Sequence, residues 1–599
     1  MNAMLVLLLA GAVLVVGYMT YGRWLAKQWG VDPSNPTPAQ QLADGIDYVP
    51  AKPYVLLGHH FSSIAGAGPI NGPIQAAVFG WVPVLLWVVI GGIFFGAVHD
   101  FGALFASLRH KGQTIASVIA ENIDNTAKKL FCVFAYLTLV LVVAAFASIV
   151  ANTFAVTPIA DGMSAEQIAK IEATNLANQR TAMISCLFIV VAIIYGLVTR
   201  GRQIPTAANV ISAILIIIAL VAIGYNLPII SLDYTTWMIL LGIYILIASV
   251  APVWILLQPR DYLSSYLLYG MIALAVVGII GATITGHAAN LDIPAFTGFT
   301  ASNAAVDAAG NPILNETGAA VINKAGASGF LFPALFITIA CGAISGFHSL
   351  VSSGTTSKQL DSEKNALPIA FGGMLLESFV AIISLCAVAF VFTTYQAGGY
   401  ASPTAVFAGG LSQMLACIPG LQNVESIAYS LLILAVSAFC LTSLDTATRL
   451  GRYMFQELFT PAGKTPDEHK SILTNKYFAT IVTVLAGVGL GMTGYTVIWP
   501  LFGAANQLLA VLALLAIAAW LKNASRNNKM LYIPMFFMLA VTLTSLVQTS
   551  MAKYTLIMAG GDIFAPAMQL LIAILLLILS VVLMVKGAKT LFGQKKAAA

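Results

Sequence analysis

The residues best suited to chemistry in this chain lie in residues 58–73, which read GHHFSSIAGAGPINGP. The imidazoles and hydroxyls of His59, His60, Ser62 and Ser63 can bind protons, cations or polar solutes. Glycine and proline weaken helices, and broken backbone within an apolar span needs protein neighbours or a water-filled cavity around it. The stretch therefore predicts an unwound segment that faces a polar cavity. Close helix packing on small residues is the alternative.

A second stretch of the same character is residues 340–356, ACGAISGFHSLVSSGTT, which contains His348. Two interrupted helices of opposite direction are typical of inverted-repeat secondary transporters, which bind substrate between them near the midplane. Half-helix N-termini there would attract a carboxylate. The candidate substrate ligands are backbone groups and hydroxyls of Ser62, Ser63, Gly66, Ala67, Gly68, Gly346, Ser349, Ser352 and Ser353.

Glu377, in GGMLLESFVAII, is the strongest candidate for a coupling proton. A charged side chain at mid-helix costs roughly 2.5–3.5 kcal/mol on insertion, so its presence needs a reason. An apolar setting favours the neutral, protonated carboxyl, which suits reversible proton binding. His59, His60 and His348 are the other candidates. A structural, hydrogen-bonded Glu377 is the alternative.

Eight further polar residues at membrane depth are predicted to form gates or structural contacts: His99, Asp100, Arg260, Asp261, Asp445, Arg449, Asn506 and Gln507. His99 and Asp100 are expected to close the third span near the inner face, where a pair that caps the helix end is an alternative to a functional role. Asn506 and Gln507 are expected to line a cavity or to hold two helices together.

The other four of these residues carry full charges. Arg449 follows Asp445 by one helical turn, and this spacing predicts a structural ion pair. Arg260 and Asp261 are adjacent and are expected to form an inner gate or an anchor.

The composition requires a membrane around these residues. Hydrophobic residues make up 59% of the 599 residues and charged residues 9%, whereas soluble proteins have roughly 25% charged residues. We expect an all-α polytopic membrane protein with about 15 transmembrane helices, within a range of about 14 to 18. The predicted spans are 3–22, 58–78, 80–100, 130–156, 181–199, 206–226, 235–257, 263–285, 329–350, 368–394, 426–446, 474–493, 498–520, 531–549 and 565–585.

The basic residues predict the orientation. All but Lys170, Arg180, Lys324 and Lys553 of the 28 Lys and Arg fall in loops on one side of this arrangement. Since basic loops stay in the cytoplasm, the N-terminus is expected outside and the C-terminus inside. The net charge of +5 is therefore a topological signal and not a nucleic-acid footprint. The first apolar segment lacks a basic n-region and is expected to be a retained helix.

No loop is long enough for a soluble catalytic domain, so residues 1–599 are expected to form one membrane domain. Residues 286–328 and 395–425 are predicted to be outer loops, and residues 508–599 to be peripheral helices. The six cysteines include no CxxC pair, which indicates neither a disulfide framework nor a zinc site. We expect no enzyme activity, cofactor or metal.

Several motifs together resemble the carbon starvation protein A family of bacterial inner-membrane transporters. In family order they are GHHFSSIAGAGP, GAVHDF, QPRDYLS, LFPALFITIACGAISGFHSLVSSGTT, GGMLLESFVAI, SLDTATR and WPLFGAANQ, over residues 58–507. The resemblance implies import of peptides or pyruvate under carbon limitation, with proton coupling. It also implies the five-plus-five inverted repeat of the amino acid–polyamine–organocation (APC) superfamily, the LeuT-like core, with additional helices. Seven segments run from the first broken helix to the one just before the second, where a repeat needs five, so two must be additions.

Three other interpretations remain open. A sodium-coupled amino-acid or peptide symporter would use the many hydroxyls and carbonyls. A channel would need a repeated pore motif or an oligomeric ring, which the sequence lacks. An intramembrane enzyme or metal site built on His59 and His60 would need an unwound backbone, because adjacent residues on a helix point about 100° apart.

Overall fold

The computed structural model describes residues 1–593 except 46, 161–162, 200–201, 203–204, 253–254, 308–309, 316–319, 462–467, 470 and 561–562. Five basic residues used in the topology prediction lie outside this part of the chain: Arg200, Lys464, Lys470, Lys595 and Lys596.

The described chain is predominantly helical. The helices of the first half are α1 Ala3–Gly17, α2 Arg23–Trp29, α3 Pro38–Gln41, α4 Pro53–Ala65, α5 Gly68–Ala76, α6 Trp81–Gly91, α7 Ala97–Arg109, α8 Ile115–Asn122, α9 Asn125–Phe154, α10 Ala165–Thr199, α11 Thr206–Asn226, α12 Tyr234–Val250 and α13 Leu257–Ile284. Those of the second half are α14 Leu331–Thr338, α15 Gly346–Gly354, α16 Gly372–Phe390, α17 Phe392–Gln396, α18 Pro403–Ala416, α19 Glu425–Phe459, α20 Lys476–Gly491, α21 Tyr495–Asn523, α22 Tyr532–Ala559 and α23 Phe564–Phe592. Two short antiparallel strands, β1 Thr300–Ala301 and β2 Gly329–Phe330, lie between them.

Eleven helices in the described residues are long and apolar enough to cross a membrane. Two shorter apolar helices, Tyr234–Val250 and Lys476–Gly491, accompany them. The outermost helices expose large apolar side chains, such as Leu215 (61%) and Met551 (66%), which hydrocarbon solvates and water does not. The predicted all-α, multi-pass membrane architecture is confirmed at this level.

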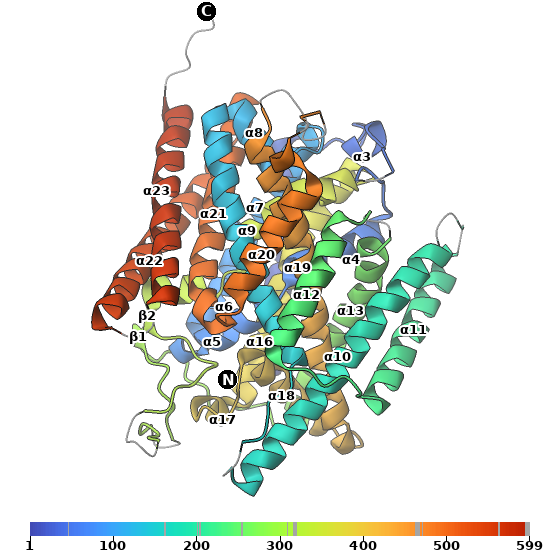
Figure 1. Ribbon diagram of the computed structural model, residues 1–599, viewed down its shortest axis with the longest axis vertical. Helices are drawn as coiled ribbons and strands as arrows, with labels where there is room; N and C mark the ends of the chain where they lie inside the picture. The colour runs from blue at the N-terminus through green and yellow to red at the C-terminus, as the bar shows by residue number, and fades with distance from the viewer. Residues whose placement is uncertain are drawn as a thin grey trace, which may run out of the picture.

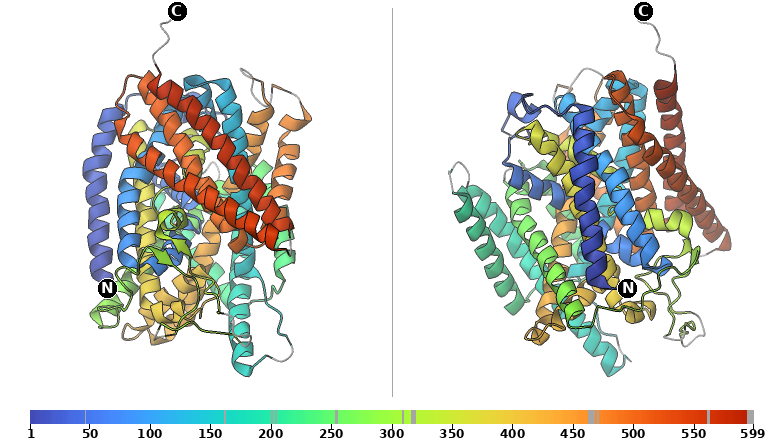
Figure 2. Two further views of the ribbon diagram at one scale, coloured as in Figure 1. Left: turned by 90° about the vertical axis from the view of Figure 1, so that its left-hand side faces the viewer. Right: turned by 180° about the vertical axis from the view of Figure 1, so that it is seen from behind.

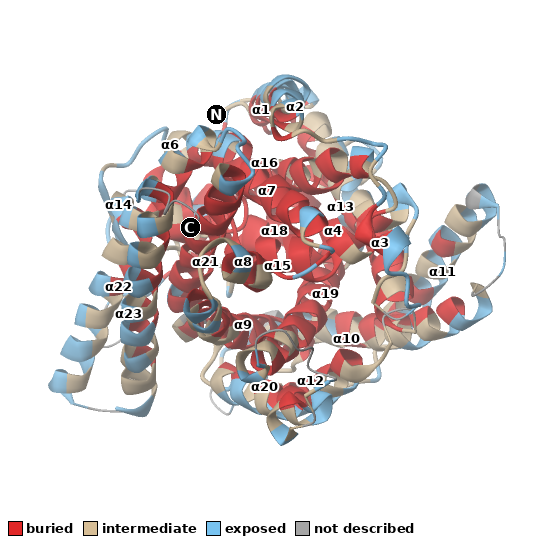
Figure 3. Cartoon of the chain, turned by 90° about the horizontal axis from the view of Figure 1, so that it is seen from above, coloured by how far each residue is buried: buried red, intermediate tan, exposed pale blue. Residues whose placement is uncertain are grey.

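The helices form a bundle in which α23 ends at one end and α1 begins toward the other (Figures 1 and 2). Viewed along the bundle, α4, α7, α15, α16 and α19 occupy its buried centre, and α1, α11, α22 and α23 lie at its periphery (Figure 3). The α10–α11 hairpin stands at one edge of the bundle (Figure 1).

Both predicted interruptions are present. The first separates α4 from α5 at Gly66, whose φ of 41° and ψ of −153° suit glycine. A side chain there would also approach the Phe146 ring to 2.8 Å. The second separates α14 from α15 across residues 339–345.

The two interruptions touch each other. A methyl group on Gly68 would overlap the side chain of Cys341, and one on Gly342 would lie 3.7 Å from Pro69 Cα. The two segments are about 270 residues apart in sequence, yet their backbones pack together as in paired discontinuous helices.

Close packing at Gly346 gives a stability prediction. A Cβ at this position would overlap backbone atoms of Asn506 and Ala510 on α21. We expect Gly346→Ala to destabilise the protein by about 3 kcal/mol and to lower the melting temperature measured by tryptophan fluorescence in detergent. Gly489→Ala on α20 is the matched control, because no heavy atom lies within 4 Å of its Cβ position. Equal melting temperatures for the two variants would refute the packing argument.

One expectation about an element is wrong. His99 and Asp100 do not close the third span near the inner face: the helical segment runs over Trp81–Arg109, and both side chains are fully buried within it. The sequence signal failed because the residues after Asp100, FGALFASLR, are again apolar and continue the helix.

Residues 395–425 include the 14-residue helix α18, whose side chains are mostly buried. It packs against α13, α16 and α19.

Candidate functional site

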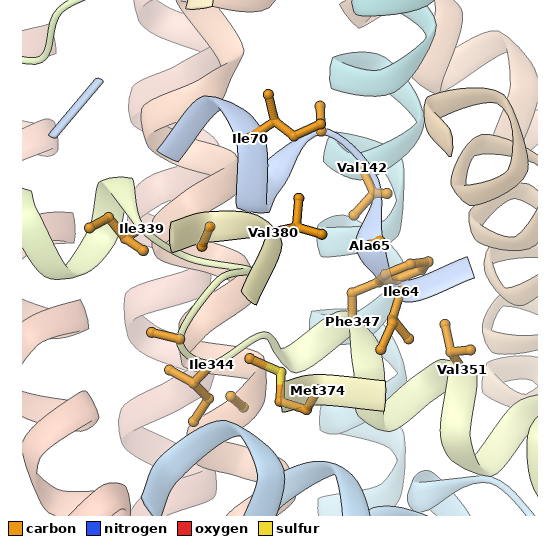
Figure 4. Close-up of a cluster of buried hydrophobic side chains, with 14 of the residues drawn as sticks. Ile64, Ala65, Ile70, Val142, Ile339, Ile344, Phe347, Val351, Met374 and Val380 are labelled. Atoms are coloured by element: carbon orange, nitrogen blue, oxygen red, sulfur yellow. The ribbon is translucent and has the colours of Figure 1, made fainter. Parts of the chain in front are cut away.

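Apolar side chains fill the space between the two interruptions. Ile64, Ile70, Ile339, Ile344 and Phe347 come together there from both broken helices (Figure 4). All five are at most 3% exposed. The interruptions are therefore closed to solvent in this conformation.

A cavity begins immediately beyond this cluster. Its volume is about 1150 Å³, and its lining includes Asn71 on α5 and Thr338 on α14, a few residues from the two interruptions. Its polar lining consists chiefly of side-chain amides and hydroxyls, among them Gln75, Asn152, Asn323, Thr404 and Tyr495. Uncharged donors and acceptors of this kind suit a polar solute.

Two hydrogen bonds join side chains that line the cavity. Thr404 Oγ1 donates to Asn71 Oδ1 (3.1 Å), and Gln75 Nε2 donates to the Tyr495 hydroxyl (3.3 Å). These bonds connect α5 with α18 and α21. Of the four residues, the sequence indicated only Asn71, as part of the polar stretch 58–73. The convergence of Gln75, Thr404 and Tyr495 on this region depends on long-range contacts.

A buried cluster of histidines and carboxylates lies on the other side of the interruptions. His348 Nδ1 donates to Asp100 Oδ2 (2.8 Å), and His99 Nδ1 donates to Asp100 Oδ1 (2.7 Å). His348 Nε2 lies 3.3 Å from Glu377 Oε2. These four residues come from α7, α15 and α16 and are fully buried. The structure thus brings together Glu377 and His348, which were predicted separately as proton-coupling candidates.

The cluster has unused hydrogen-bonding capacity. His348 Nε2 and both Glu377 oxygens have no hydrogen-bond partner among the described residues. Because Asp100 accepts from two imidazoles, it behaves as a carboxylate, and His348 carries a proton on Nδ1. With Glu377 ionised and Nε2 unprotonated, two acceptors would face each other. One proton between His348 and Glu377 removes this repulsion.

Cys341 adjoins this pair. Its Sγ, together with ligand atoms of His348 and Glu377, forms a group within 4.8 Å that could hold a metal ion. However, Cys341 Sγ donates to Ser345 Oγ (3.7 Å) and accepts from Asn506 Nδ2 (3.8 Å). This is the bonding of a neutral thiol, whereas a metal ligand is a thiolate.

A metal site shared by His59 and His60 does not fit the geometry. His59 Nδ1 bonds Asp261 Oδ2 on α13 (2.7 Å), and His60 Nδ1 bonds Thr356 Oγ1 (2.9 Å). The two rings therefore bond to partners on different elements.

A second charged cluster surrounds Arg260. Its guanidinium donates to Asp261 Oδ1 through Nη2 (2.6 Å) and Nε (3.1 Å), and to the Tyr244 hydroxyl (2.7 Å). It also forms an ion pair with Asp445 on α19.

The predicted Asp445–Arg449 ion pair is wrong. Arg449 instead donates to backbone carbonyls of Ala248 and Ala251, and lies 3.8 Å from Asp47. Arg449 lies one helical turn from Asp445 on α19, but the partner of Asp445 is Arg260, which lies on α13.

The candidate serines fall into two groups. Ser349 and Ser353 donate to carbonyl oxygens of their own helix, those of Gly346 and Ser349. Ser63 Oγ lies 3.5 Å from Thr446 Oγ1. The hydroxyls of Ser62 and Ser352 are buried without a partner among the described residues.

Asn506 and Gln507 hold helices together. Asn506 Oδ1 accepts from the Phe347 N–H (2.8 Å), and Asn506 Nδ2 donates to Ser345 Oγ (3.0 Å). Gln507 Nε2 donates to the Phe336 carbonyl oxygen. Both residues thereby connect α21 to the second broken helix, which is one of the two roles predicted for them.

The comparisons with known proteins agree with this architecture. The chain matches the family model described as Carbon starvation protein CstA over residues 2–399 and 393–545. A protein named peptide transporter CstA from Campylobacter jejuni is 32% identical over 92% of this chain and 80% of its own length. Its Escherichia coli namesake is 33% identical over 91% and 80%.

Another Escherichia coli relative carries a different name. The protein named pyruvate/proton symporter BtsT is 30% identical over 86% of this chain and 76% of its own length. Among solved structures, a manganese transporter from Eremococcus coleocola aligns with 92% of this chain and 99% of its own at 11% identity and a TM-score of 0.48, a likeness too low to carry an argument. The family match and the relatives agree, and the chain belongs to the carbon starvation protein CstA family as a multi-pass membrane transporter and not an enzyme.

Proposed function

We propose that this transporter imports peptides or small carboxylates such as pyruvate across the bacterial inner membrane. Import is coupled to the movement of protons and proceeds by alternating access. The observation that carries the proposal is the spatial order of three features in the bundle. A polar cavity ends at two touching helix interruptions, and a buried histidine–glutamate pair follows directly. The names of the relatives supply the two substrate classes.

The proposed core is a LeuT-like, five-plus-five inverted repeat. Its first half consists of α4/α5, α6/α7, α9, α12 and α13, and its second of α14/α15, α16, α19, α20 and α21. Each half then begins with an interrupted helix. The α10–α11 hairpin supplies the two additional helices, and α1, α22 and α23 complete a total of fifteen spans. Mutual packing of α9, α12, α19 and α20 supports this division.

The proposed orientation has the N-terminus outside and the C-terminus in the cytoplasm. The cavity is lined by residues of the segments after α9, before α14 and before α18, which the distribution of basic residues assigns to the outer side. The described conformation is then outward-facing, with the substrate path closed at the interruptions.

The proposed substrate site forms when the apolar cluster between the interruptions opens. Backbone groups of Gly66, Ala67, Gly68 and Gly346 would then meet a substrate carboxylate. The unpartnered hydroxyls of Ser62 and Ser352 support this assignment, and Ser63, Ser349 and Ser353 line the same segments.

The proposed coupling site is the pair formed by Glu377 and His348, oriented by Asp100. A proton bound there neutralises the Glu377 carboxylate, which suits its apolar setting. Release of the proton changes the charge next to both broken helices. His59 and His60 remain candidates on α4.

Uptake by the purified protein in proteoliposomes tests this function. Radiolabelled dialanine and pyruvate are offered under an inward proton gradient, an inward sodium gradient, or neither. We expect saturable accumulation of at least one compound with the proton gradient alone. Accumulation driven only by sodium would replace the coupling ion, and non-saturable flux would indicate a channel.

Cysteine labelling tests the predicted side of the cavity. Thr338→Cys, in a background lacking the half-buried Cys186 and Cys417, should react with a membrane-impermeant thiol reagent applied from outside. Thr338 is half-buried and lines the cavity. Ser352→Cys is the control and should stay unlabelled, because Ser352 is fully buried. Labelling of Thr338→Cys only from the cytoplasmic side would reverse the orientation.

A further inference from the structure

The Arg260 cluster joins four helices that the proposed transport cycle must move relative to one another. Tyr244 lies on α12, Arg260 and Asp261 on α13, Asp445 on α19, and His59 on the inner half of the broken first helix, α4. His59 contacts the cluster through Asp261, at 2.7 Å. Side chains of His59, Arg260, Asp261 and Asp445 are at most 3% exposed.

The charges of this cluster do not balance without a further proton. Asp261 accepts hydrogen bonds from Arg260 and from His59 Nδ1, and Asp445 accepts from Arg260 and from the Tyr244 hydroxyl (2.6 Å). Both aspartates therefore act as acceptors, as carboxylates do. One guanidinium against two carboxylates leaves one uncompensated negative charge, which is costly at full burial.

The imidazole of His59 is placed to correct this imbalance. Nδ1 already donates to Asp261, and Nε2 is buried without a partner among the described residues. A proton added to Nε2 makes the ring cationic and the cluster neutral. The neutral and charged forms make the same contact with Asp261, so the ring can gain and lose this proton without leaving its place.

The charged and titratable groups nearby have other contacts. On α19, Arg452 donates to the Ser249 carbonyl oxygen. On α19, Arg449 faces Asp47 and two carbonyl oxygens. On α4, His60 Nδ1 forms a hydrogen bond with Thr356 Oγ1. On α12, Tyr244 already bonds both Arg260 and Asp445.

We propose that His59 Nε2 is a second proton-binding site, separate from the Glu377–His348 pair, and that each transport cycle therefore moves two protons. The proposal rests on the proposed function and deepens it by fixing its stoichiometry. Protonated His59 holds the inner half of α4 to α13 and α19 through Asp261. Loss of the proton leaves a net negative charge in the cluster, which weakens this attachment and favours opening toward the cytoplasm.

The proton-to-substrate ratio measured from reversal potentials in proteoliposomes tests the proposal, with dialanine as probe, or with pyruvate if the wild type accumulates only pyruvate. We expect a ratio of two for the wild type and one for His59→Asn, whose amide keeps a donor toward Asp261. His287→Asn removes an exposed histidine of an outer loop and should keep a ratio of two.

The outcomes separate the two proposals. Uptake that ignores the proton gradient in the wild type overturns the proposed function. A wild-type ratio of one leaves the proposed function intact and overturns the second site, as does a ratio of two in His59→Asn.

Nitrogen NMR of histidine-labelled protein gives a readout that does not need transport. The chain has only 7 histidines, and the signal missing from His59→Asn, or from His59→Gln if the first variant does not fold, identifies His59. A doubly protonated ring at neutral pH supports the proposal, and an unprotonated Nε2 overturns it.

Discussion

The Glu377→Gln variant is expected to take up substrate under a proton gradient at about a tenth of the wild-type rate or less, because a side chain with a fixed protonation state can no longer bind and release the proton that shifts the conformational equilibrium next to both broken helices. Glutamine has the size and hydrogen-bonding groups of a protonated glutamate but never ionises. The variant therefore mimics one protonation state permanently, and only the step that changes protonation is blocked.

Substrate exchange separates this effect from misfolding. With equal substrate and pH on both sides of the liposome, exchange needs no net proton movement, so Glu377→Gln should retain it. Glu425→Gln is the matched control, because Glu425 is exposed at the start of α19. Proton-driven uptake at the wild-type rate in Glu377→Gln would remove Glu377 from the coupling role.

The local part of the fold was predictable from sequence because its causes are local. Glycine, proline and serine within apolar segments predicted both helix interruptions, and Gly66 breaks its helix through its own φ and ψ. Apolar segment length predicted a polytopic helical protein, since hydrocarbon requires internally bonded backbone.

The organisation of the polar clusters was not predictable in the same way. Asp445 was expected to pair with Arg449, four residues away, but it pairs with Arg260, 185 residues away. His348 and Asp100 are 248 residues apart and share a hydrogen bond. Such contacts depend on how helices pack, and one sequence gives each residue's chemistry but not its partner.

The same limit applies to His99 and Asp100. Their charge suggested an interfacial position, which is the usual location of a charged pair near the end of a span. The structure buries both instead, where His99 and His348 satisfy the two oxygens of Asp100. A buried carboxylate with two imidazole donors needs no interface, and sequence carries no signal for the second donor.

The Arg260 cluster supports a second prediction of large effect, on stability. Arg260→Met should destabilise the protein by about 3–5 kcal/mol, the range for removal of one partner from a buried ion pair. The substitution leaves Asp261 and Asp445 as two buried carboxylates with no guanidinium between them. Asp445→Asn should cost less, because it removes one negative charge and keeps polar atoms for Arg260 and Tyr244.

The charge argument also predicts a rescue. Adding Asp445→Asn to Arg260→Met removes one of the two buried carboxylate charges, so the double variant should be more stable than Arg260→Met alone. Simple loss of contacts predicts the opposite order, because two lost interactions cost more than one. Thermal unfolding in detergent, followed by tryptophan fluorescence, distinguishes the two orders.

Lys586→Met provides the scale for this experiment. Lys586 pairs with Asp124 at 2.8 Å, but their side chains are 30% and 42% exposed, and such pairs contribute about 0–1 kcal/mol. An Arg260→Met protein as stable as Lys586→Met would mean that the buried cluster is not held by its charges. The argument that the cluster needs a proton on His59 to be neutral would then fail, because a cluster that tolerates two carboxylates without a guanidinium does not require that proton.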